Sequence, residues 1–267
     1  MSSESDHLKR WVLITGASRG IGEVFARYFA REGWNLVLVA RSLERLNELA
    51  RSLSNDFSCE TQVISADLRD HSSPLHIYED VKRKGIQIDG LINNAGFGGG
   101  GKFAESDLNR YLQMIDVNVR ALVELAHLFL KDMIKRKRGF IINVSSTACY
   151  QPLPYASVYA ATKSFVTSFT EALWSEAKRT GVRILNLCPG LTKTDFGAEA
   201  GIGDFKQDPF AETPEKVVEN AFRALQGNAP TVISGFQNRL LVLLERLFPH
   251  RLLLWLVFAF QKSKRGV

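Results

Sequence analysis

The feature that most constrains the fold of this chain is the alternation of short apolar stretches with amphipathic ones. The apolar stretches are rich in Val and Ile, and Gly, Asp or Ser follows them. Buried strands that are each followed by a crossover helix are typical of a parallel sheet covered on both faces. Strands are expected near residues 11–15, 35–40, 61–65, 88–93, 139–144, 182–188 and 230–233. We therefore predict a doubly wound α/β fold with about seven parallel strands, helices on both faces, and ligands at the carboxyl ends of the strands.

The positive charge of the chain is concentrated at its C-terminal end. From residue 239 onward there are six Lys or Arg residues and one acid, Glu245, which accounts for five of the six formal net charges. A nearly neutral body argues against a nucleic-acid-binding face on the main domain. The polar segment 1–10 has no apolar core of the kind found in a secretory signal. With three widely spaced cysteines (Cys59, Cys149 and Cys188), expected as reduced core thiols in strands or at strand ends, this predicts a cytoplasmic protein.

A glycine-rich run follows the first expected strand. Thr15-Gly-Ala-Ser-Arg-Gly-Ile-Gly22 comes directly after Trp11–Ile14 and opens an amphipathic segment. A strand, a tight glycine turn and a helix start together form a site for a dinucleotide pyrophosphate. The spacing of the glycines differs from GxGxxG, so the prediction depends on this context and on Ser18 and Arg19 within the loop.

The end of the second expected strand bears on the choice of dinucleotide. Sites that select NAD place an acid there to bind the ribose 2′-hydroxyl, whereas this chain has Arg41-Ser42. Arg41 and Arg19 could bind a 2′-phosphate through charge-assisted hydrogen bonds, which favours NADP(H). The alternative is that Arg41 is an exposed helix start paired with Glu44.

Tyr159 and Lys163 are spaced as neighbours on one face of a helix. A lysine ammonium beside a tyrosine hydroxyl favours the phenolate, which makes the pair a candidate general acid and base. Ser146 precedes Tyr159 by thirteen residues, and Asn118 falls in a long helix predicted from about Glu105 to Arg136. Because Ser145 and Ser146 follow a strand and point opposite ways, the spacing assigns catalysis to Ser146 alone.

Taken in order, these motifs resemble those of the short-chain dehydrogenase/reductase family, in its short, single-domain, NADP-preferring branch with a Rossmann fold. The resemblance covers about residues 10–235. It rests on Thr15–Gly22, Asp67-Leu68, Asn93-Asn-Ala-Gly96, Asn118, Ile142–Ser146, Tyr159-x3-Lys163 and Pro189-Gly190 through Thr194.

The resemblance implies a role for each matching residue. Tyr159 would exchange a proton with the substrate oxygen, Ser146 would hydrogen-bond that oxygen, and Asn118 would hold a water that links Lys163 to solvent. Lys163 would lower the pKa of Tyr159 and hold the nicotinamide ribose. The residues implied in cofactor binding are Gly16, Ser18, Arg19, Gly20, Ile21, Gly22, Arg41, Ser42, Asp67, Leu68, Asn94, Ala95, Gly96, Tyr159, Lys163, Pro189, Gly190, Thr192 and Thr194.

The expected substrate is an apolar carbonyl compound or secondary alcohol. The segment 192–213 would be the variable substrate loop, and its Phe196, Phe205 and Phe210 could line a pocket with Phe97, Tyr150 and Tyr155. These aromatics could equally pack the loop onto the body. The run Gly98–Gly101 is either a flexible loop or backbone at the mouth of the site. No metal site is predicted, because the five histidines (His7, His71, His76, His127 and His250) lie far from these motifs.

The C-terminal segment lies beyond the motifs. We predict a single dinucleotide-binding and catalytic domain over residues 1–237 and an apolar, basic-flanked tail over 238–267. The longest apolar run of the tail, residues 252–260, would reach about 14 Å as a helix, less than half of the ~30 Å bilayer core. Three interpretations stay open: a subunit contact or lid, an interfacial membrane helix, or core packing. The sequence favours a homo-oligomeric enzyme, and the alternative is a non-catalytic NADP-sensing or membrane-surface protein on the same fold.

Overall fold

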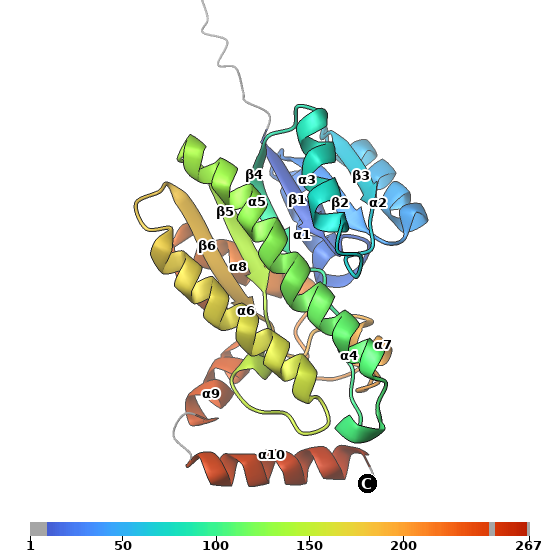
Figure 1. The fold of residues 1–267 in the computed structure, drawn as a ribbon, viewed down its shortest axis with the longest axis vertical. Coiled ribbons are helices and arrows are strands. Elements are labelled where there is room, and N and C mark those ends of the chain that lie inside the picture. Colours follow the sequence, from blue (N-terminus) through green and yellow to red (C-terminus); the bar gives the residue numbers. More distant parts are fainter. Residues whose placement is uncertain (1–9, 246–248, 266–267) are drawn as a thin grey trace, which may run out of the picture.

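A computed structural model of the protein describes residues 10–245 and 249–265, and over these residues it shows an α/β sandwich (Figure 1). The strands are β1 (Trp11–Thr15), β2 (Asn35–Ala40), β3 (Thr61–Ser65), β4 (Ile88–Asn93), β5 (Gly139–Val144), β6 (Val182–Cys188) and β7 (Thr231–Ile233). The α-helices are α1 (Gly20–Arg31), α2 (Leu43–Asp56), α3 (Ser73–Arg83), α4 (Leu108–Ile115), α5 (Ala121–Arg136), α6 (Ser157–Glu176), α7 (Phe196–Glu199), α8 (Pro214–Gln226), α9 (Phe236–Glu245) and α10 (His250–Arg265). Two 3₁₀ turns, η1 (Phe103–Glu105) and η3 (Thr147–Cys149), and a π-helical turn, η2 (Asp116–Arg120), complete the described elements.

The sheet has the order β3-β2-β1-β4-β5-β6-β7, and every strand pair is parallel. The predicted parallel sheet is therefore confirmed, and the strand positions agree with the apolar stretches. Strand order reverses at β1, which pairs with both β2 and β4. At such a point the crossover connections leave in opposite directions, so a crevice opens at the carboxyl ends of the two strands.

Two apolar cores fill the space between the sheet and its two helix layers. One core packs α1, α2 and α8 against the sheet through residues such as Phe25, Phe29 and Leu46. The other packs α3, α5 and α6 against the opposite face through residues such as Ile77, Leu125 and Phe129. Strands such as β1, in which all five residues are buried, are consistent with coverage on both sides.

The prediction of one long helix from about Glu105 to Arg136 is wrong. The first helix in this segment, α4, starts only at Leu108, where Asp107 caps it by accepting a hydrogen bond from the Asn109 N–H at 2.9 Å. The π-helical turn η2 then interrupts it around Asn118 and separates α4 from α5. A π-helical turn inserts one extra residue per turn and re-aims the side chains near it, and such turns are frequent at functional sites.

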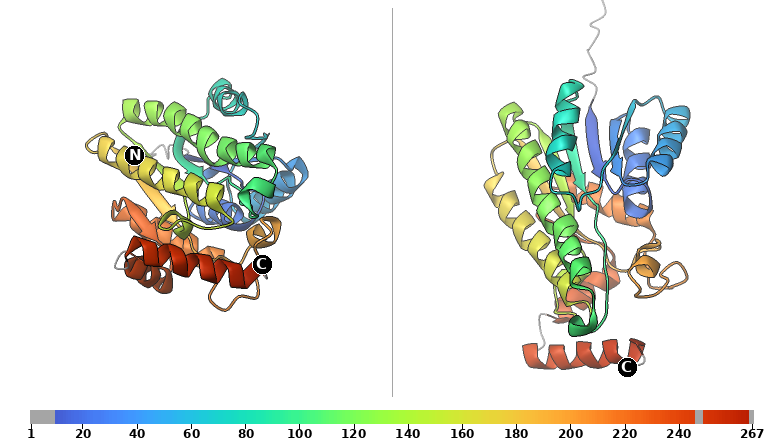
Figure 2. Two further views of the ribbon diagram at one scale, coloured as in Figure 1. Left: turned by 60° about the horizontal axis from the view of Figure 1, so that its bottom comes forward. Right: turned by 45° about the vertical axis from the view of Figure 1, so that its right-hand side comes forward.

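The C-terminal helices lie at one end of the molecule, below the sheet in Figure 1. α9 packs on the body through Val242, which is buried. α10 lies across that end and outside the helix layers in Figure 1 and in the right-hand view of Figure 2. The predicted boundary at residues 237 and 238 falls inside α9, and the division into domain and tail stays a prediction.

Candidate active site

The glycine-rich turn joins β1 to α1 and requires glycine at three positions. Gly16 and Gly20 have φ angles of +65° and +58°, which side chains disfavour. A Cβ added to Gly22 would lie 2.2 Å from the Gly16 carbonyl oxygen, so only glycine allows this close approach. α1 begins at Gly20 with its first N–H groups directed toward the crevice, which is the geometry that binds phosphate.

The turn after β4 is fixed to the glycine-rich turn by Thr15 and Asn94. The Thr15 hydroxyl accepts hydrogen bonds from the N–H groups of Asn94 and Ala95, both at 3.0 Å. The Asn94 Nδ2 group donates to the carbonyl oxygens of Thr15 at 2.9 Å and Gly16 at 3.3 Å. The two loops at the switch point therefore form one rigid wall of the crevice.

Three arginines lie at the end of this wall beside β2. Burial, and then repulsion from Arg45 and Arg41, lowers the pKa of Arg19. Within the part of the chain that the structure describes, Arg41 forms no ion pair with Glu44. Guanidinium groups clustered closely enough to lower the pKa of Arg19 are suited to a phosphate dianion, although Glu199 already pairs with Arg19.

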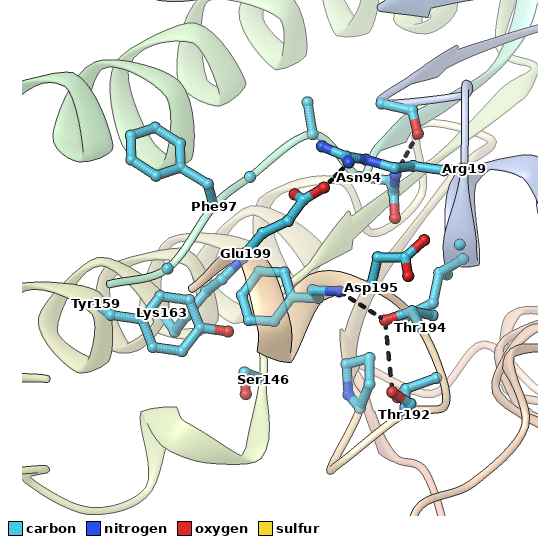
Figure 3. A pocket seen from close by; sticks show the side chains of 18 of the residues that line it. Arg19, Asn94, Phe97, Ser146, Tyr159, Lys163, Thr192, Thr194, Asp195 and Glu199 are labelled. Carbon is cyan, nitrogen blue, oxygen red and sulfur yellow. Dashed lines mark hydrogen bonds and ion pairs between the residues drawn. The ribbon is translucent and has the colours of Figure 1, made fainter. Parts of the chain in front are cut away.

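Tyr159, Lys163 and Ser146 meet at the opposite end of the crevice (Figure 3). Tyr159 and Lys163 come from α6, and the Lys163 ammonium lies 5.8 Å from the centre of the Tyr159 ring. Ser146, at the end of β5, lies near enough to the Tyr159 hydroxyl to act on its pKa, while the Ser145 hydroxyl turns to α6 and donates to the Lys163 carbonyl oxygen at 2.8 Å. The two serines point apart, as the strand geometry predicts.

Burial dominates the ionisation of the tyrosine and the lysine. It raises the pKa of Tyr159 to about 12, although the hydrogen bond from Ser146 acts in the opposite direction. Burial also lowers the pKa of Lys163 to about 8. The expectation that Lys163 lowers the tyrosine pKa is thus not met in this structure, because loss of solvation outweighs other effects on both groups. The Lys163 ammonium donates to the Val144 carbonyl oxygen at 2.9 Å.

Asn118 lies behind Lys163 and positions the backbone of the β4 loop. Its Oδ1 atom accepts from the Phe97 N–H at 3.1 Å, and its Nδ2 group donates to the Phe97 carbonyl oxygen at 3.0 Å and to Thr162 at 3.1 Å. A Cβ added to Gly96 would lie 3.0 Å from Asn118 Oδ1 and 3.4 Å from the Lys163 ammonium. Glycine at 96 therefore lets the loop approach both side chains.

The segment 192–213 closes the crevice from the other side. Glu199 on α7 forms an ion pair with Arg19 (Figure 3), and the Phe196 ring lies 5.8 Å from the Tyr159 ring between centres. Phe97, Phe196, Phe205 and Phe210 all line the pocket. Tyr150 and Tyr155 do not: the Tyr150 hydroxyl contacts Cys188, and the Tyr155 ring stacks on Phe258. Gly98 and Gly99 line the pocket as well, so part of the glycine run does form backbone at the site.

One pocket of about 1070 Å³ brings together nearly all the residues expected from the sequence. Among the predicted catalytic and cofactor-binding residues, only Gly22 and Asn118 are not on its surface, and each contacts a residue that is. The same pocket contains residues that sequence reasoning missed. Arg45 could have been found, because it lies four residues after Arg41 at the start of a helix. Glu199, Gln237, Asn238 and Leu241 gave no signal, since only folding brings their segments to the crevice.

The described residues contain no group of His, Cys, Asp or Glu side chains that could hold a metal ion. His71, His76 and His127 lie outside the pocket, His7 lies outside the described residues, and the His250 side chain is also outside them. All three cysteines are free thiols. Cys59 precedes β3 and Cys188 ends β6, but Cys149 lies in η3 rather than in a strand, because the chain turns immediately after Ser146.

Comparison with known proteins gives consistent matches. The sequence model of the short chain dehydrogenases matches residues 10–204. The chain is 38% identical to sulfoacetaldehyde reductase 2 of Chromohalobacter salexigens over 69% of this chain and 73% of that protein. It is 29% identical to the very-long-chain 3-oxoacyl-CoA reductase of Mus musculus over 97% and 82%. A short-chain dehydrogenase from Sphingobium yanoikuyae, solved in complex with NADPH, superposes with a TM-score of 0.79 at 32% identity, covering 84% of this chain and 87% of that one.

Proposed function

Because the chain belongs to the short-chain dehydrogenase family, we propose that it is an NADP(H)-dependent oxidoreductase that interconverts an apolar carbonyl compound and its secondary alcohol. The observation that carries the proposal is the contact between the Tyr159 hydroxyl and Ser146 in the same pocket as the glycine-rich turn. A proton-transfer group and a dinucleotide cradle that share one crevice fit a reaction in which a proton and a hydride reach one carbonyl group.

The pocket fits the dinucleotide on its own geometry. The turn around Gly16, Gly20 and Gly22 leaves backbone N–H groups open to a pyrophosphate. Arg19, Arg41 and Arg45 supply cations where a 2′-phosphate would lie, and Asp67 and Leu68 line the wall expected to meet adenine. When bound, NADP(H) supplies or accepts the hydride. The NADPH complex of a similar enzyme supports this choice of cofactor.

The protein's own residues would handle the proton and the orientation of the substrate. Tyr159 would donate its hydroxyl proton to the carbonyl oxygen during reduction, and Ser146 would hold that oxygen within reach. A pKa of about 12 keeps Tyr159 protonated at neutral pH, so the acid form is present for reduction. Lys163 would hold the nicotinamide ribose and stabilise the tyrosinate once the proton has left. Asn118 would hold a water in a proton path from Lys163.

An apolar substrate is supported by the lining of the pocket near Tyr159. Four phenylalanines, together with Leu153, Ile202 and Leu241, line the pocket, and one of them, Phe196, lies beside Tyr159 with 5.8 Å between the ring centres. Such a lining contributes binding free energy by removing apolar surface from water and leaves few fixed charges for an anionic group. The two named relatives act on different compounds, so the individual substrate is not specified by the comparison. A purely NADP-sensing protein is not favoured, because both are reductases.

The substitution Tyr159→Phe tests the proposal. It removes only the transferable proton, so we expect loss of nearly all turnover, at least about a hundredfold, with NADPH affinity almost unchanged. The assay follows NADPH oxidation over a panel of ketones, aldehydes and ketosteroids, and calorimetry measures cofactor binding. Tyr111→Phe, on α4 and outside the pocket, is the matched control. Retention of most of the wild-type kcat by Tyr159→Phe would show that the acid is another group.

A further inference from the structure

The helix α10 is apolar around most of its circumference, but the body covers only one side of it. Residues 252–260 are nine consecutive apolar residues. A surface helix of a globular protein needs one apolar stripe, and here Leu253, Leu254 and Val257 supply it as half-buried residues. Four further apolar side chains of this run are exposed: Leu252 by 42%, Trp255 by 64%, Leu256 by 40% and Phe258 by 44%. The helix therefore carries a second apolar face that the described part of the protein does not cover.

Other exposed apolar side chains lie at the same end of the molecule. α9 exposes Leu240, Leu241, Leu243 and Leu244, each by more than 40%. The η1 turn, coloured green in Figures 1 and 2, lies close above α10 in both views and carries Phe103, which is 62% exposed. Contiguous exposed apolar surface of this kind marks an interaction site.

The charges of this segment indicate what the apolar face meets. From residue 246 to the end the sequence contains no Asp or Glu and five basic residues, which flank the apolar run on both sides: Arg246, Arg251, Lys262, Lys264 and Arg265. Two copies of α10 packed on each other around a two-fold axis would place these like charges together, which opposes self-association. An anionic lipid surface instead attracts the basic flanks while its acyl chains accept the apolar face.

The length of the helix limits how it could meet a bilayer. α10 has 16 residues, and its apolar run would reach about 14 Å against the ~30 Å hydrocarbon core. No helix in the described ranges is long and apolar enough to span a membrane. We propose that α10 is an interfacial helix, which lies in the plane of an anionic membrane surface with Leu252, Trp255, Leu256 and Phe258 at the boundary between headgroups and acyl chains.

This surface adjoins the substrate end of the pocket. The Phe258 ring stacks on Tyr155, with 6.2 Å between the ring centres. Tyr155 lies in the loop before α6, whose Leu153 and Ala156 line the pocket, and Leu241 of α9 lines it too. A protein docked through α10 would thus open its pocket beside the bilayer, where apolar carbonyl compounds concentrate. This last step rests on the proposed function, whereas binding of α10 to lipid does not.

The test is sedimentation of the full chain with two kinds of vesicle, phosphatidylcholine alone and phosphatidylcholine mixed with phosphatidylglycerol. We expect binding to the mixed vesicles that weakens as salt rises, since salt screens the basic flanks. Leu256→Glu should weaken binding at least about tenfold, because it loses the free energy of burying a leucine. Arg251→Gln should weaken it by about fivefold. Blue-shifted Trp255 fluorescence on vesicle addition, absent in Trp255→Phe, gives an independent readout.

Matched controls change the same residue types elsewhere on the surface. Leu75→Glu on α3 alters a leucine that is 48% exposed, and Arg51→Gln on α2 removes an exposed arginine. Both should bind vesicles like the wild type, and thermal melting checks that every variant is folded.

The proposal is overturned if the chain does not bind mixed vesicles at low salt, or if Leu75→Glu weakens binding as much as Leu256→Glu. It is also overturned if Leu256→Glu leaves vesicle binding intact but lowers the mass in light scattering, which would assign the face to a second copy of the chain. Because none of these measurements uses substrate, they can fail independently of the Tyr159 assay.

Discussion

At the scale of single residues, the site depends on polar groups held out of water. Lys163 is buried below the pocket with its ammonium on the Val144 carbonyl oxygen, and Tyr159 is enclosed beside Ser146. Burial disfavours the charged form of each residue. In the absence of other partners, it therefore shifts both side chains toward their uncharged forms. If Tyr159 is the proposed acid, this environment keeps it protonated beside a lysine whose pKa is lowered, which would suit reversible proton transfer.

The lowered pKa of Lys163 predicts a pH dependence of stability. Between about 8 and the ordinary 10.5, the unfolded chain retains a proton that the folded chain has lost. The free energy of unfolding therefore rises with pH over this window, by about 3 kcal/mol in total. Tyr159 acts in the opposite direction only above its ordinary pKa of 10, where the folded chain keeps its proton.

Lys163→Met removes this titration and keeps an apolar chain of similar length. Urea unfolding of both proteins, measured from about pH 8 to about pH 10, should show a rise in the free energy of unfolding for the wild type that the variant lacks. Lys178→Met, at a residue that follows the end of α6 and lies outside the pocket, should retain the rise. Parallel curves for wild type and Lys163→Met would contradict the buried, easily deprotonated lysine.

At the scale of elements, the proposed preference for NADP(H) depends on the start of α2 and on the glycine-rich turn. Ser42 caps α2 by accepting from the Arg45 N–H at 3.4 Å, which fixes the first turn of the helix. Arg41 and Arg45 thereby lie on either side of the cap and close enough to Arg19 to lower its pKa. Because the three cations repel one another before any ligand binds, a phosphate dianion stabilises them more than it would stabilise a single arginine.

We therefore expect NADPH to bind at least tenfold tighter than NADH, a difference of about 1.4 kcal/mol. Arg41→Asp should abolish the preference, and Arg45→Gln should weaken NADPH binding about tenfold while leaving NADH affinity unchanged. Arg51→Gln, on the same helix but outside the pocket, is the control. Calorimetric titration with both dinucleotides decides the matter, and equal affinities in the wild type would refute the role of the cluster.

At the scale of the whole molecule, α9 and α10 differ in how they join the body. Asn238 donates to the Ser234 carbonyl oxygen at 2.7 Å, and a Cβ added to Gly190 would lie 2.3 Å from the Asn238 amide. α9 thus packs directly on the Pro189–Thr194 segment, which would hold the nicotinamide. α10 instead lies across the end of the body, largely exposed.

Two truncations separate these roles. A chain that ends at Pro249 should keep NADPH binding and turnover of a water-soluble ketone, because Val242 and Asn238 remain in place. A chain that ends at Asn238 should lose most turnover, since it removes the buried Val242 and the pocket residue Leu241. Activity assays and light scattering test both chains. Equal activity of the two would show that α9 contributes nothing to the site, and a lower mass for the chain that ends at Pro249 would assign α10 to a subunit contact instead of a lipid surface. The cytoplasmic location stays a prediction.

The sequence alone determined the elements whose signal is local. β1 and β5 are almost wholly buried and mostly apolar in sequence, and Tyr159 and Lys163 share a helix face because of their spacing. The glycine-rich turn could be located because backbone strain at Gly16 and Gly20 leaves few other residues possible. These patterns depend on neighbours in the chain, so they can be recognised without the fold.

The tertiary structure alone decided which distant segments meet. The Asn118 side chain, in the π-helical turn, bonds the backbone of Phe97, which comes from the loop after β4. Glu199 reaches Arg19, and Asn238 reaches Gly190, only after the sheet has brought the carboxyl ends of its strands to one edge. The direction of the Tyr159 pKa likewise follows from burial among these segments. No periodicity within one stretch of sequence encodes such contacts, because each is a property of packing between segments far apart in the chain.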